Sequence, residues 1–437
     1  MTGLTNALEA GGQPAVISVV GVGYIGLATA AMLASKGFDV HGIDVNPRVV
    51  ASVNAGRAHI QDPGLDSLVA KTVQAGRLRA HLEPQRANVT IIATPTPISD
   101  DDRHAPDLTY VMAAARSIAP VLRPGDLVIL ESTSPIGTTR EVAECIAELR
   151  SDLRPPVEGE ADPNIFLAYC PERIIPGQML RELSQNDRII GGMDRRSAEK
   201  AASVYKELGS GQLHLTDDRT AEMVKLTENA YRDVNIAFAN EMSLLCKKAG
   251  LNVFEVIKLA NRHPRVKILR PGPGVGGHCI AVDPWFIVAR DPDNSRLIAT
   301  ARRINDGKPH QVVEETLALA GDVPGAIVCL GLTYKEDVGD FRESPSLVVA
   351  RALTGALGSR VLCVDPFAST VEGRKETSGL NMVALEDGLR RAGVVVVLVP
   401  HKPFRTVQFR SSVRLVDTVG LFESRSPTLV RVAKAAY

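Results

Sequence analysis

Short apolar runs alternate with helical stretches along the first part of the chain. The β-branched run from Ala15 to Val20 predicts a strand, and the stretch from Leu27 to Lys36 predicts the helix that follows it. Three more apolar runs predict strands, at Asp39 to Ile43, Val89 to Ala93 and Leu127 to Leu130, and further strands are predicted at Ile165 to Tyr169 and Gln212 to Leu215. Because strands that alternate with helices build parallel sheets, this pattern predicts a doubly wound sheet with its ligand site at the carboxyl ends of the strands.

The pattern changes in the middle of the chain. From Asp217 to about Asn261, apolar residues recur with the 3.6-residue period of a helix, and only Gly250 interrupts them. We therefore expect a long helix followed by a shorter one. The next segment, from Pro271 to Asp283, is rich in glycine and proline and predicts a loop, after which a helical region extends to about Gly307.

The last third returns to alternating strands and helices. Strands are predicted at Ala326 to Leu330, Arg360 to Val364, Val394 to Val399 and Arg414 to Val416, with a helix from about Ser346 to Leu357. The predicted fold class is α/β, with two Rossmann-like, doubly wound parallel-sheet domains joined by a long central helix. The predicted domain boundaries are 1–214, 215–310 and 311–437.

A glycine-rich turn, Gly21-Val22-Gly23-Tyr24-Ile25-Gly26, joins the first strand to the first helix. Glycines at this spacing let the turn close tightly, let the backbone approach a pyrophosphate and let the helix pack closely. Asp44 ends the second strand, where its carboxylate can accept hydrogen bonds from a ribose 2′-hydroxyl and would repel a 2′-phosphate. The pattern predicts a site for NAD rather than NADP, with nearby Arg48 as the one feature that favours a phosphate.

A polar stripe lies on the long predicted helix. Lys225, Asn229 and Arg232 fall within roughly 60° of one another on a helix with 100° per residue. From this spacing alone, the ordinary interpretation is a solvated face. The helix is apolar over most of its circumference, however, and such a helix is typically buried, so that a lysine on it needs a partner or a function.

The glycine-rich loop PGPGVGGHCIAVDPW places Cys279 where the backbone can approach a ligand closely. Cys329 and Cys363 lie instead in apolar strands, as structural cysteines do. We predict that Cys279 is a nucleophile, because a thiolate can be stabilised by a cation such as Lys225. His278 has no cluster of Cys, His or Asp at ligand spacing around it, so no metal site is predicted.

A nucleophilic thiol together with a nicotinamide cofactor indicates a reaction type. The thiol adds to an aldehyde to give a thiohemiacetal, and loss of hydride then gives a thioester that water releases as a carboxylate. If the aldehyde is itself formed in place from an alcohol, the enzyme consumes two NAD.

Charge and composition exclude several classes of partner. The 437 residues include 50 Lys and Arg and 50 Asp and Glu, so the chain lacks the basic excess of a nucleic-acid binder. The longest apolar run, Val394 to Val399, is too short to cross a membrane, and the first residues have no leader pattern. The six cysteines have no paired spacing, so we expect thiols and a cytoplasmic protein.

The motifs together resemble the family of nucleotide-sugar 6-dehydrogenases, from about Val16 to Val416. In chain order they are GVGYIG, ATPTP, ESTSPIGTT, CPERIIPG, KLTENAYRDVNIAFANE, GPGVGGHC and RESP. The resemblance implies a four-electron oxidation of a sugar C6 alcohol to a carboxylate with two NAD. Residues 261–286 are most similar to the branch that acts on UDP-N-acetyl-D-mannosamine, which implies a uronate for surface polysaccharide biosynthesis. UDP-glucose and UDP-N-acetylglucosamine are the alternatives, although Ile280 to Asp283 lacks the lysine common in UDP-glucose enzymes.

The resemblance assigns three residues to the covalent chemistry. Cys279 matches the nucleophile that forms the thiohemiacetal and thioester. Lys225 matches the lysine that stabilises the developing oxyanion and shuttles the C6 proton, and Asn229 matches its oxyanion partner.

Three further residues match positions that handle water and protons. Asp283 and Thr133 match the pair that positions water for thioester hydrolysis. Glu172 matches an acid–base or water-positioning group on the opposite side of the sugar. For all three, the ordinary alternative is a turn or capping residue.

The resemblance also implies which residues hold the ligands and how the chain assembles. The UDP-sugar positions are Arg173, Ile174, Lys225, Asn229, Arg232, His263, Arg265, Gly276, Tyr334 and Lys335. The NAD positions are Gly21, Gly23, Tyr24, Ile25, Gly26, Asp44, Arg48, Thr94, Thr133 and Arg342. The three domains would be NAD-binding, helical and UDP-sugar-binding, with a homodimer formed through the central helix. One late position departs from the family, because relatives often carry a basic residue where this chain has Val419.

Two other interpretations remain open. A two-electron dehydrogenase of the β-hydroxyacid type also combines a Rossmann domain with a helical domain that carries Lys and Asn one turn apart, but it would not need Cys279. A nucleotide-sugar-binding protein without activity would need none of Cys279, Lys225, Asn229 and Asp283. The number of NADH formed per sugar distinguishes all three.

Overall fold

The computed structural model describes residues 15–60, 62–99, 104–156, 162–175, 177–277, 279–321 and 323–422. They divide into two compact units. The first comprises the described parts of Met1–Glu228 and Trp285–Arg290, and the second those of Asn229–Pro284 and Asp291–Tyr437. The predictions made for the first 14 residues and for His278 lie outside the described residues. None of the helices within the described ranges has the length and apolar character needed to cross a membrane.

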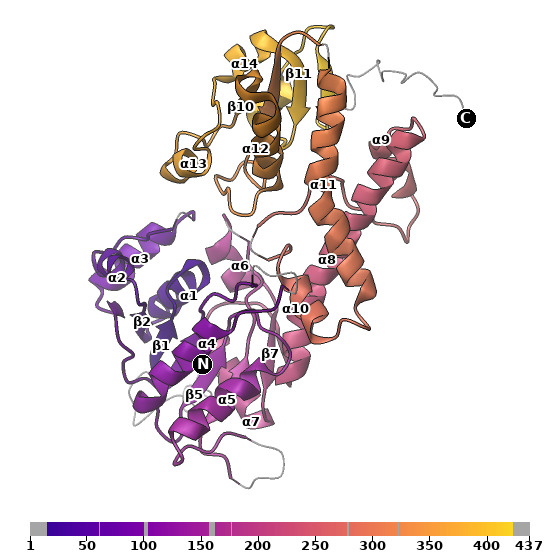
Figure 1. Cartoon of the computed structure of the whole chain (residues 1–437). Coiled ribbons are helices and arrows are strands. Elements are labelled where there is room, and N and C mark those ends of the chain that lie inside the picture. The colour runs from indigo at the N-terminus through magenta and orange to yellow at the C-terminus, as the bar shows by residue number, and fades with distance from the viewer. Residues whose placement is uncertain are drawn as a thin grey trace. The chain divides into compact units, whose positions relative to one another are not determined.

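The first unit, drawn mostly in indigo to magenta in Figure 1, contains an eight-stranded sheet. Its strand order is β3-β2-β1-β4-β5-β6-β7-β8. Its strands are β1 (Val16–Val20), β2 (Asp39–Ile43), β3 (Leu78–His81), β4 (Val89–Ile92), β5 (Leu127–Leu130), β6 (Phe166–Tyr169), β7 (Arg188–Gly192) and β8 (Leu213–Asp217). Neighbouring strands run parallel, which confirms the predicted sheet, except that β6 and β7 are antiparallel. The sequence pattern did not predict β3 and β7, because Arg79 interrupts the first of these short runs and Arg188 opens the second.

Helices cover both faces of this sheet because its central strands are apolar on both sides. Ile129 of β5 packs into one hydrophobic cluster, with α1, α2, α3, α6 and α7, whereas Val128 packs into the other, with α4 and α5. The helices are α1 (Tyr24–Ser35), α2 (Pro47–Asn54), α3 (Leu65–Gln74), α4 (Thr109–Ile118), α5 (Thr138–Leu149), α6 (Met179–Gln185), α7 (Arg195–Tyr205) and the short 3₁₀ helix η2 (Ala119–Val121).

The order of the strands locates the ligand site of this sheet. β1 lies between β2 and β4, so the chain turns to opposite sides after β1 and after β3. In open α/β sheets, this arrangement leaves a crevice at the carboxyl ends of the two central strands. The glycine-rich turn follows β1 and Thr94 follows β4, so both segments lie at this edge.

The second unit contains a four-stranded parallel sheet in the order β10-β9-β11-β12, which confirms the second predicted sheet. Cys329 packs into a cluster with α11 and α12 on one face, and Val328 packs with Phe404 on the other. The strands are β9 (Ala326–Leu330), β10 (Val361–Val364), β11 (Ala392–Val397) and β12 (Arg414–Asp417). The helices associated with them are α12 (Pro345–Leu357), η3 (Gly358–Arg360), α13 (Val371–Glu376), α14 (Leu385–Arg391) and η4 (Lys402–Thr406).

Four helices lie between the two sheets in the sequence: α8 (Asp218–Lys248), α9 (Val253–Ala260), α10 (Asp283–Arg290) and α11 (Arg296–Ala320). The predicted long helix followed by a shorter one is thus confirmed. The last of them extends further than predicted, because α11 continues past Gly307 and through Pro309. Pro309 has no N–H group to donate to the Asn305 carbonyl. Gly274 lies against this carbonyl, since a Cβ atom added there would come within 3.3 Å of its oxygen.

α8 and α11 are joined by a buried ion pair. Arg302 Nη1 lies 2.5 Å from Asp233 Oδ1, and neither side chain is more than 1% exposed. Other side chains of α8 face outward, since Tyr231 is 67% exposed and Phe238 is 51% exposed. The expectation that this helix is buried around most of its circumference is therefore wrong, because part of its apolar surface has no cover within the described chain.

Candidate active site

The three glycines of the turn after β1 have different surroundings. Gly21 has φ +89°, and a side chain there would come within 2.8 Å of the Ala93 carbonyl oxygen. A side chain at Gly26 would lie 1.9 Å from the Gly21 oxygen, so only glycine lets α1 pack this closely on the turn. A Cβ atom at Gly23 would meet nothing within 4 Å among the described residues. The turn is therefore tight on its inner side and open where α1 begins, as a backbone cradle for a phosphate requires.

Polar groups suited to a dinucleotide surround this cradle. Asp44 follows β2, is half-buried, and accepts a hydrogen bond from Asn46 N at 2.9 Å. Thr94 Oγ1 is buried and has no hydrogen-bond partner among the described residues. An orphaned hydroxyl at the carboxyl edge of the sheet fits a ligand that donates or accepts there. Thr133 is half-buried in the loop after β5, and Arg48 is exposed on α2.

Glu222, in the second turn of α8, caps α5 and thereby holds the loop that carries Thr133. Its carboxylate accepts hydrogen bonds from Gly137 N at 2.6 Å, Thr139 N at 2.9 Å and Thr139 Oγ1 at 2.7 Å. Burial raises the pKa of Glu222 to about 7, although these three hydrogen bonds favour the ionised form. The sequence reasoning missed this residue, because a glutamate on a predicted helix is ordinarily exposed.

Lys225 is buried, with 7% of the residue exposed. Its Nζ donates a hydrogen bond to the backbone oxygen of Glu172 at 2.9 Å. Arg173 points its guanidinium to Glu228 Oε1 at 2.7 Å, and Ile174 packs against the adjacent hydrophobic cluster. The CPER segment and the predicted lysine therefore meet within the first unit.

The Glu172 side chain forms a buried ion pair with Arg188, which opens β7. Arg188 Nη1 lies 2.9 Å from Glu172 Oε2, and each side chain is 6% exposed. The other carboxylate oxygen accepts a hydrogen bond from Arg173 N at 2.7 Å. The Arg188 guanidinium also lies over the Tyr205 ring, 4.8 Å from its centroid. Arg188 was not predicted as a site residue, although a charged residue at the start of an apolar strand is a signal that could have identified it.

A second buried carboxyl group lies beside this pair. Glu131 follows β5 and accepts hydrogen bonds from Thr29 Oγ1 and from the Tyr205 hydroxyl, each at 3.3 Å. Burial, and then the Glu172 carboxylate, raise the pKa of Glu131 to about 8. Burial also raises the pKa of the Cys170 thiol to about 12, so this neighbouring cysteine stays protonated.

Cys279 is exposed, whereas the other five cysteines are buried. It lies one turn before α10, and its carbonyl oxygen accepts a hydrogen bond from Asp283 N at 2.8 Å. The Asp283 residue is 3% exposed, and its Oδ2 accepts a hydrogen bond from Asn229 Nδ2 at 2.5 Å. Three of the predicted catalytic residues thus lie along one chain of contacts in the second unit.

The loop that carries Cys279 packs against the loop that carries Tyr334. A side chain at Gly276 would come within 2.9 Å of Tyr334 Cβ and 2.5 Å of the Glu343 oxygen. At Gly277, which has φ +83°, it would lie 3.0 Å from the Tyr334 ring. The two loops can therefore approach this closely only because these positions are glycines.

The predicted ligand-binding cations of the second unit are mostly exposed. Lys335, Arg232 and Arg265 are exposed, and His263 accepts a hydrogen bond from Arg265 N at 3.3 Å. Arg342 is held by Asp340, with its Nε 2.9 Å from Asp340 Oδ1. Exposed cations are available to a phosphate ligand without breaking a buried contact.

A cavity of about 470 Å³ opens beside the carboxyl ends of β11 and β12. Val419 lines the cavity, at the position where this chain lacks the basic residue that the family resemblance implies. Arg270 and Arg405 line the same cavity together with Glu336, whose Oε2 lies 3.0 Å from Arg405 Nη2. Neither arginine was predicted as a site residue.

Three family models match this chain, all from the UDP-glucose/GDP-mannose dehydrogenase family. The NAD binding domain matches residues 15–209, the central domain residues 219–307 and the UDP binding domain residues 328–426. An NDP-N-acetyl-D-galactosaminuronic acid dehydrogenase from Ralstonia solanacearum is 49% identical over 413 residues, which cover 94% of this chain and 96% of the relative. A UDP-N-acetyl-D-mannosamine dehydrogenase from Campylobacter jejuni is 50% identical over 394 residues, or 90% of this chain and 97% of the relative.

Solved structures agree with this assignment. A UDP-N-acetyl-D-mannosamine dehydrogenase from Pyrococcus horikoshii has a TM-score of 0.81 at 37% identity, covering 93% of this chain and 96% of that one. A UDP-N-acetyl-mannosamine dehydrogenase from Staphylococcus aureus has a TM-score of 0.79 at 36% identity, covering 93% of this chain and 99% of that one. The chain therefore belongs to the UDP-glucose/GDP-mannose dehydrogenase family and uses NAD as its cofactor.

Proposed function

We propose that this protein oxidises UDP-N-acetyl-D-mannosamine at C6 to UDP-N-acetyl-D-mannosaminuronate and consumes two NAD per sugar. The observation that carries the proposal is the environment of Cys279. Its side chain is exposed, its carbonyl is bound to Asp283 N, and the Asp283 carboxylate accepts the Asn229 amide. A thiol beside a fixed amide and carboxylate suits an oxidation that passes through a covalent carbonyl intermediate.

The choice of sugar is supported by the names of the relatives. Enzymes named UDP-N-acetyl-D-mannosamine dehydrogenase are 49% identical to this chain in Yersinia pestis and 50% identical in Campylobacter jejuni. Among the branches of the family, this is the one that the segment from Asn261 to Phe286 resembles most. A 2-acetamido sugar linked to UDP is therefore the proposed substrate class.

Cys279 would carry the sugar through the second oxidation. Its sulfur bonds to C6 of the aldehyde and forms a thiohemiacetal, and loss of hydride from C6 leaves a thioester. Water then adds to C6, the C–S bond breaks, and the carboxylate is released with the thiol restored. When bound, NAD accepts the hydride in each of the two oxidations.

Lys225 and Asn229 would stabilise negative charge as it develops on the C6 oxygen. The Lys225 ammonium has three N–H donors, and among the described residues it uses one of them on the Glu172 carbonyl. The remaining donors can bind the oxygen, whereas uptake of the C6 hydroxyl proton would need the neutral amine form of the same side chain. Asp283 and Thr133 would hold the hydrolytic water, and Glu172 would orient water or exchange a proton on the opposite side of the sugar.

Two sets of residues would bind the nucleotides. The open face at Gly23 and the start of α1 at Tyr24 and Ile25 suit the NAD pyrophosphate, and Asp44 suits a ribose hydroxyl. The cations proposed for the UDP-sugar are Arg173, Arg232, His263, Arg265 and Lys335, with Arg342 assigned to NAD. Their charge suits a pyrophosphate, since guanidinium and ammonium groups form strong hydrogen bonds to phosphate oxygens.

One incubation tests the proposal. The protein is mixed with NAD and, in separate reactions, UDP-N-acetylmannosamine, UDP-N-acetylglucosamine and UDP-glucose, and the NADH formed per sugar is counted. We expect two NADH, and only with the first sugar. One NADH per sugar would indicate a two-electron dehydrogenase, and none with any sugar would indicate a binding protein.

A second candidate substrate is UDP-N-acetyl-D-galactosamine. The relative from Ralstonia solanacearum that is 49% identical to this chain is named for N-acetyl-D-galactosaminuronic acid. Adding the galactosamine sugar to the incubation distinguishes the candidates, because the two sugars differ at C2 and C4.

A homodimer formed through α8 is part of the proposal. Tyr231, Phe238 and Leu245 are 67%, 51% and 55% exposed and follow one another at intervals of seven residues. Seven residues make nearly two helical turns, so the three side chains share one face of the helix. An exposed apolar stripe with this period is typical of a helix–helix interface.

The domain organisation stays a prediction. The proposed domains are 1–214 for NAD, 215–310 for the central helices and 311–437 for the UDP-sugar. The matched family segments lie within these bounds, whereas positions 214 and 310 fall inside β8 and α11. A cytoplasmic location and a role in surface polysaccharide biosynthesis also stay predictions.

A further inference from the structure

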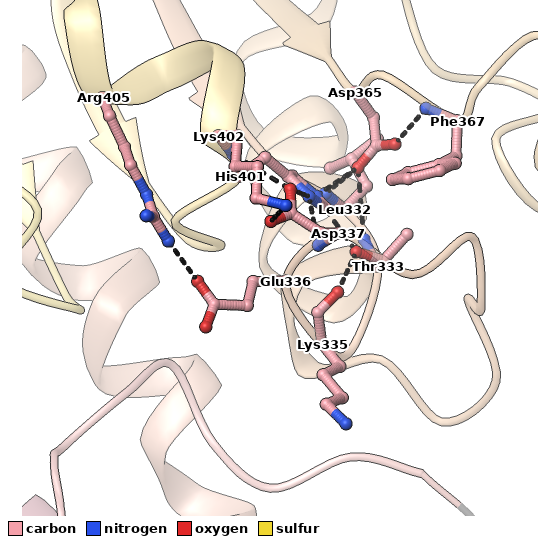
Figure 2. A network of polar contacts seen from close by, with 10 residues as sticks. All are labelled: Leu332, Thr333, Lys335, Glu336, Asp337, Asp365, Phe367, His401, Lys402 and Arg405. Carbon is pink, nitrogen blue, oxygen red and sulfur yellow. Dashed lines mark hydrogen bonds and ion pairs between the residues drawn. The ribbon is translucent and has the colours of Figure 1, made fainter. Parts of the chain in front are cut away.

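A buried histidine connects the ends of three strands in the second sheet (Figure 2). His401 follows β11 and is fully buried, Asp365 follows β10, and the loop from Leu332 to Asp337 follows β9. The Asp365 Oδ2 atom accepts hydrogen bonds from Leu332 N at 2.6 Å and Thr333 N at 3.3 Å. The three strand ends therefore meet in a single polar network.

The partners of His401 determine which ring nitrogen carries the proton. Asp337 N donates a hydrogen bond to His401 Nδ1 at 2.9 Å, so Nδ1 holds a lone pair and the proton is on Nε2. Thr333 Oγ1 donates its own proton to the Lys335 oxygen at 2.9 Å. The Thr333 hydroxyl oxygen must therefore accept a hydrogen bond from His401 Nε2, which lies 3.1 Å away. Asp365 Oδ2, 3.3 Å from His401 Nε2, is a second acceptor.

The loop needs this support because its backbone is strained. Asp337 has φ +57°, in the left-handed region that residues other than glycine rarely adopt. Two hydrogen bonds hold it there, one from its own N–H to His401 Nδ1 and one from Lys402 N to its Oδ1 at 3.0 Å. Phe367 and Phe404 pack around the His401 ring, with centroids 5.6 Å and 5.5 Å away, and fix its orientation.

The same loop carries two residues that the family resemblance assigns to the UDP-sugar, Tyr334 and Lys335. Thr333 Oγ1 fixes the backbone oxygen of Lys335, and Tyr334 N donates a hydrogen bond to the Asp340 oxygen at 3.0 Å. Figure 2 shows the Lys335 side chain pointing away from the network. The network thus holds the backbone on one side and leaves the ammonium group available on the other.

We propose that His401 is a positioning residue for the UDP-sugar. It holds the 332–337 loop in its strained conformation, so that Lys335 and Tyr334 are placed for the nucleotide. This inference rests on the proposed function. The Nδ1 atom of His401 is the essential part, because it accepts the hydrogen bond from the backbone of the strained residue Asp337. The Nε2 donor contributes less to the loop conformation, since its partners Thr333 and Asp365 also bind other groups in the loop.

Two substitutions separate the two nitrogens. His401→Gln keeps a donor near the place of Nε2 but loses the acceptor for Asp337 N, whereas His401→Asn keeps an acceptor near the place of Nδ1 and loses the Nε2 donor. For His401→Gln we expect the KM for the UDP-sugar to rise about five- to tenfold, the effect of losing one hydrogen bond. The KM for NAD and the kcat at saturating sugar should stay within about twofold of the unsubstituted protein, and His401→Asn should restore most of the affinity.

A control separates positioning from general loss of stability. Val395→Ala removes buried apolar atoms from β11 in the same unit without touching the loop. It should lower the melting temperature and leave the KM for the UDP-sugar unchanged. The calorimetric affinity for UDP alone should follow the same order as the KM values, with Gln the weakest.

The outcomes are distinguishable. If the unsubstituted protein oxidises no UDP-sugar, the proposed function fails. If it does, but His401→Gln leaves the KM for the sugar and the affinity for UDP unchanged, the inference fails. Equal increases in KM for Gln, Asn and Val395→Ala would also overturn it, because the effect would then come from stability rather than from the Nδ1 acceptor.

Discussion

Arg188 and Glu172 form an ion pair in which each side chain is only 6% exposed, with Nη1 and Oε2 2.9 Å apart. The same glutamate offers its backbone oxygen to Lys225 Nζ. The pair therefore fixes the segment that contacts the proposed catalytic lysine. A substitution of Arg188 should therefore lower the stability of the fold and disturb the position of Lys225.

We expect Arg188→Met to lower the free energy of unfolding by about 3–5 kcal/mol, because it leaves the Glu172 carboxylate buried without its partner. Arg195→Met is the matched control. The Arg195 and Glu199 side chains of its ion pair are 90% and 51% exposed, so this pair should contribute less than about 1 kcal/mol to the free energy of unfolding. Chemical denaturation measures both variants. Equal small losses would contradict the buried ion pair.

Cys279→Ser should abolish formation of the uronate, with a loss of about 10³-fold or more in the rate of the four-electron reaction, because an alcohol replaces the nucleophilic thiol. Mass spectrometry of the product and the NADH count measure this. Cys145→Ala changes a buried cysteine of α5 and should retain two NADH per sugar. Full uronate formation by Cys279→Ser would rule out the thioester route.

Asp44→Asn should raise the KM for NAD by about tenfold and leave the KM for the UDP-sugar unchanged, because the amide binds a ribose hydroxyl less strongly than a carboxylate does. The variant should also discriminate less against NADP. Asp39→Asn, at the other end of β2 in an exposed pair with Arg77, is the control and should change neither constant. An unchanged KM for NAD in Asp44→Asn would place the ribose elsewhere.

Glu131 should make the stability of the first unit depend on pH. Its pKa in the fold, about 8, lies above the ordinary value of 4.5, so its contribution to stability is full below pH 4.5 and is lost as the pH rises through 8. We expect Glu131→Gln, which resembles the protonated form, to lose less stability than the unsubstituted protein between pH 6 and pH 9. The difference should reach a few kcal/mol at most, since one pH unit corresponds to about 1.4 kcal/mol. Parallel stability curves for the two proteins would refute a proton held by Glu131.

Phe238→Asp should convert the proposed dimer to a monomer, because it puts a charge into the apolar stripe on α8. Static light scattering measures the change as a twofold drop in mass. Val371→Asp alters a residue that is 82% exposed on α13 and should leave the mass unchanged. A monomer mass for the unsubstituted protein would remove the dimer altogether.

Local features carried the successful predictions. The strands β1, β4, β5, β9 and β11 are largely apolar runs, and the turn after β1 needs its glycines for reasons of backbone geometry that act over a few residues. Cys279 was identifiable because glycines surround it, while Cys329 and Cys363 lie in apolar strands. These signals depend only on neighbouring positions in the chain.

The missed residues depend on contacts between distant segments. His401 binds Asp337 and Thr333 across more than 60 positions, and it does so because β10, β9 and β11 lie side by side. Arg188 is the counter-ion of Glu172 because β7 runs antiparallel beside β6, a pairing that hydrophobic patterning does not reveal. A histidine directly after an apolar strand was the available signal for the first, and an arginine opening a strand was the signal for the second.

The unequal burial of the cysteines makes the protein suitable for selective chemical labelling. A bulky alkylating reagent applied to the folded chain should attach once, at Cys279, because Cys145, Cys170, Cys246, Cys329 and Cys363 are buried. The reagent would therefore count active centres in a preparation without any engineered cysteine. Protection of that single position by a bound nucleotide sugar would give a direct binding assay that does not depend on turnover.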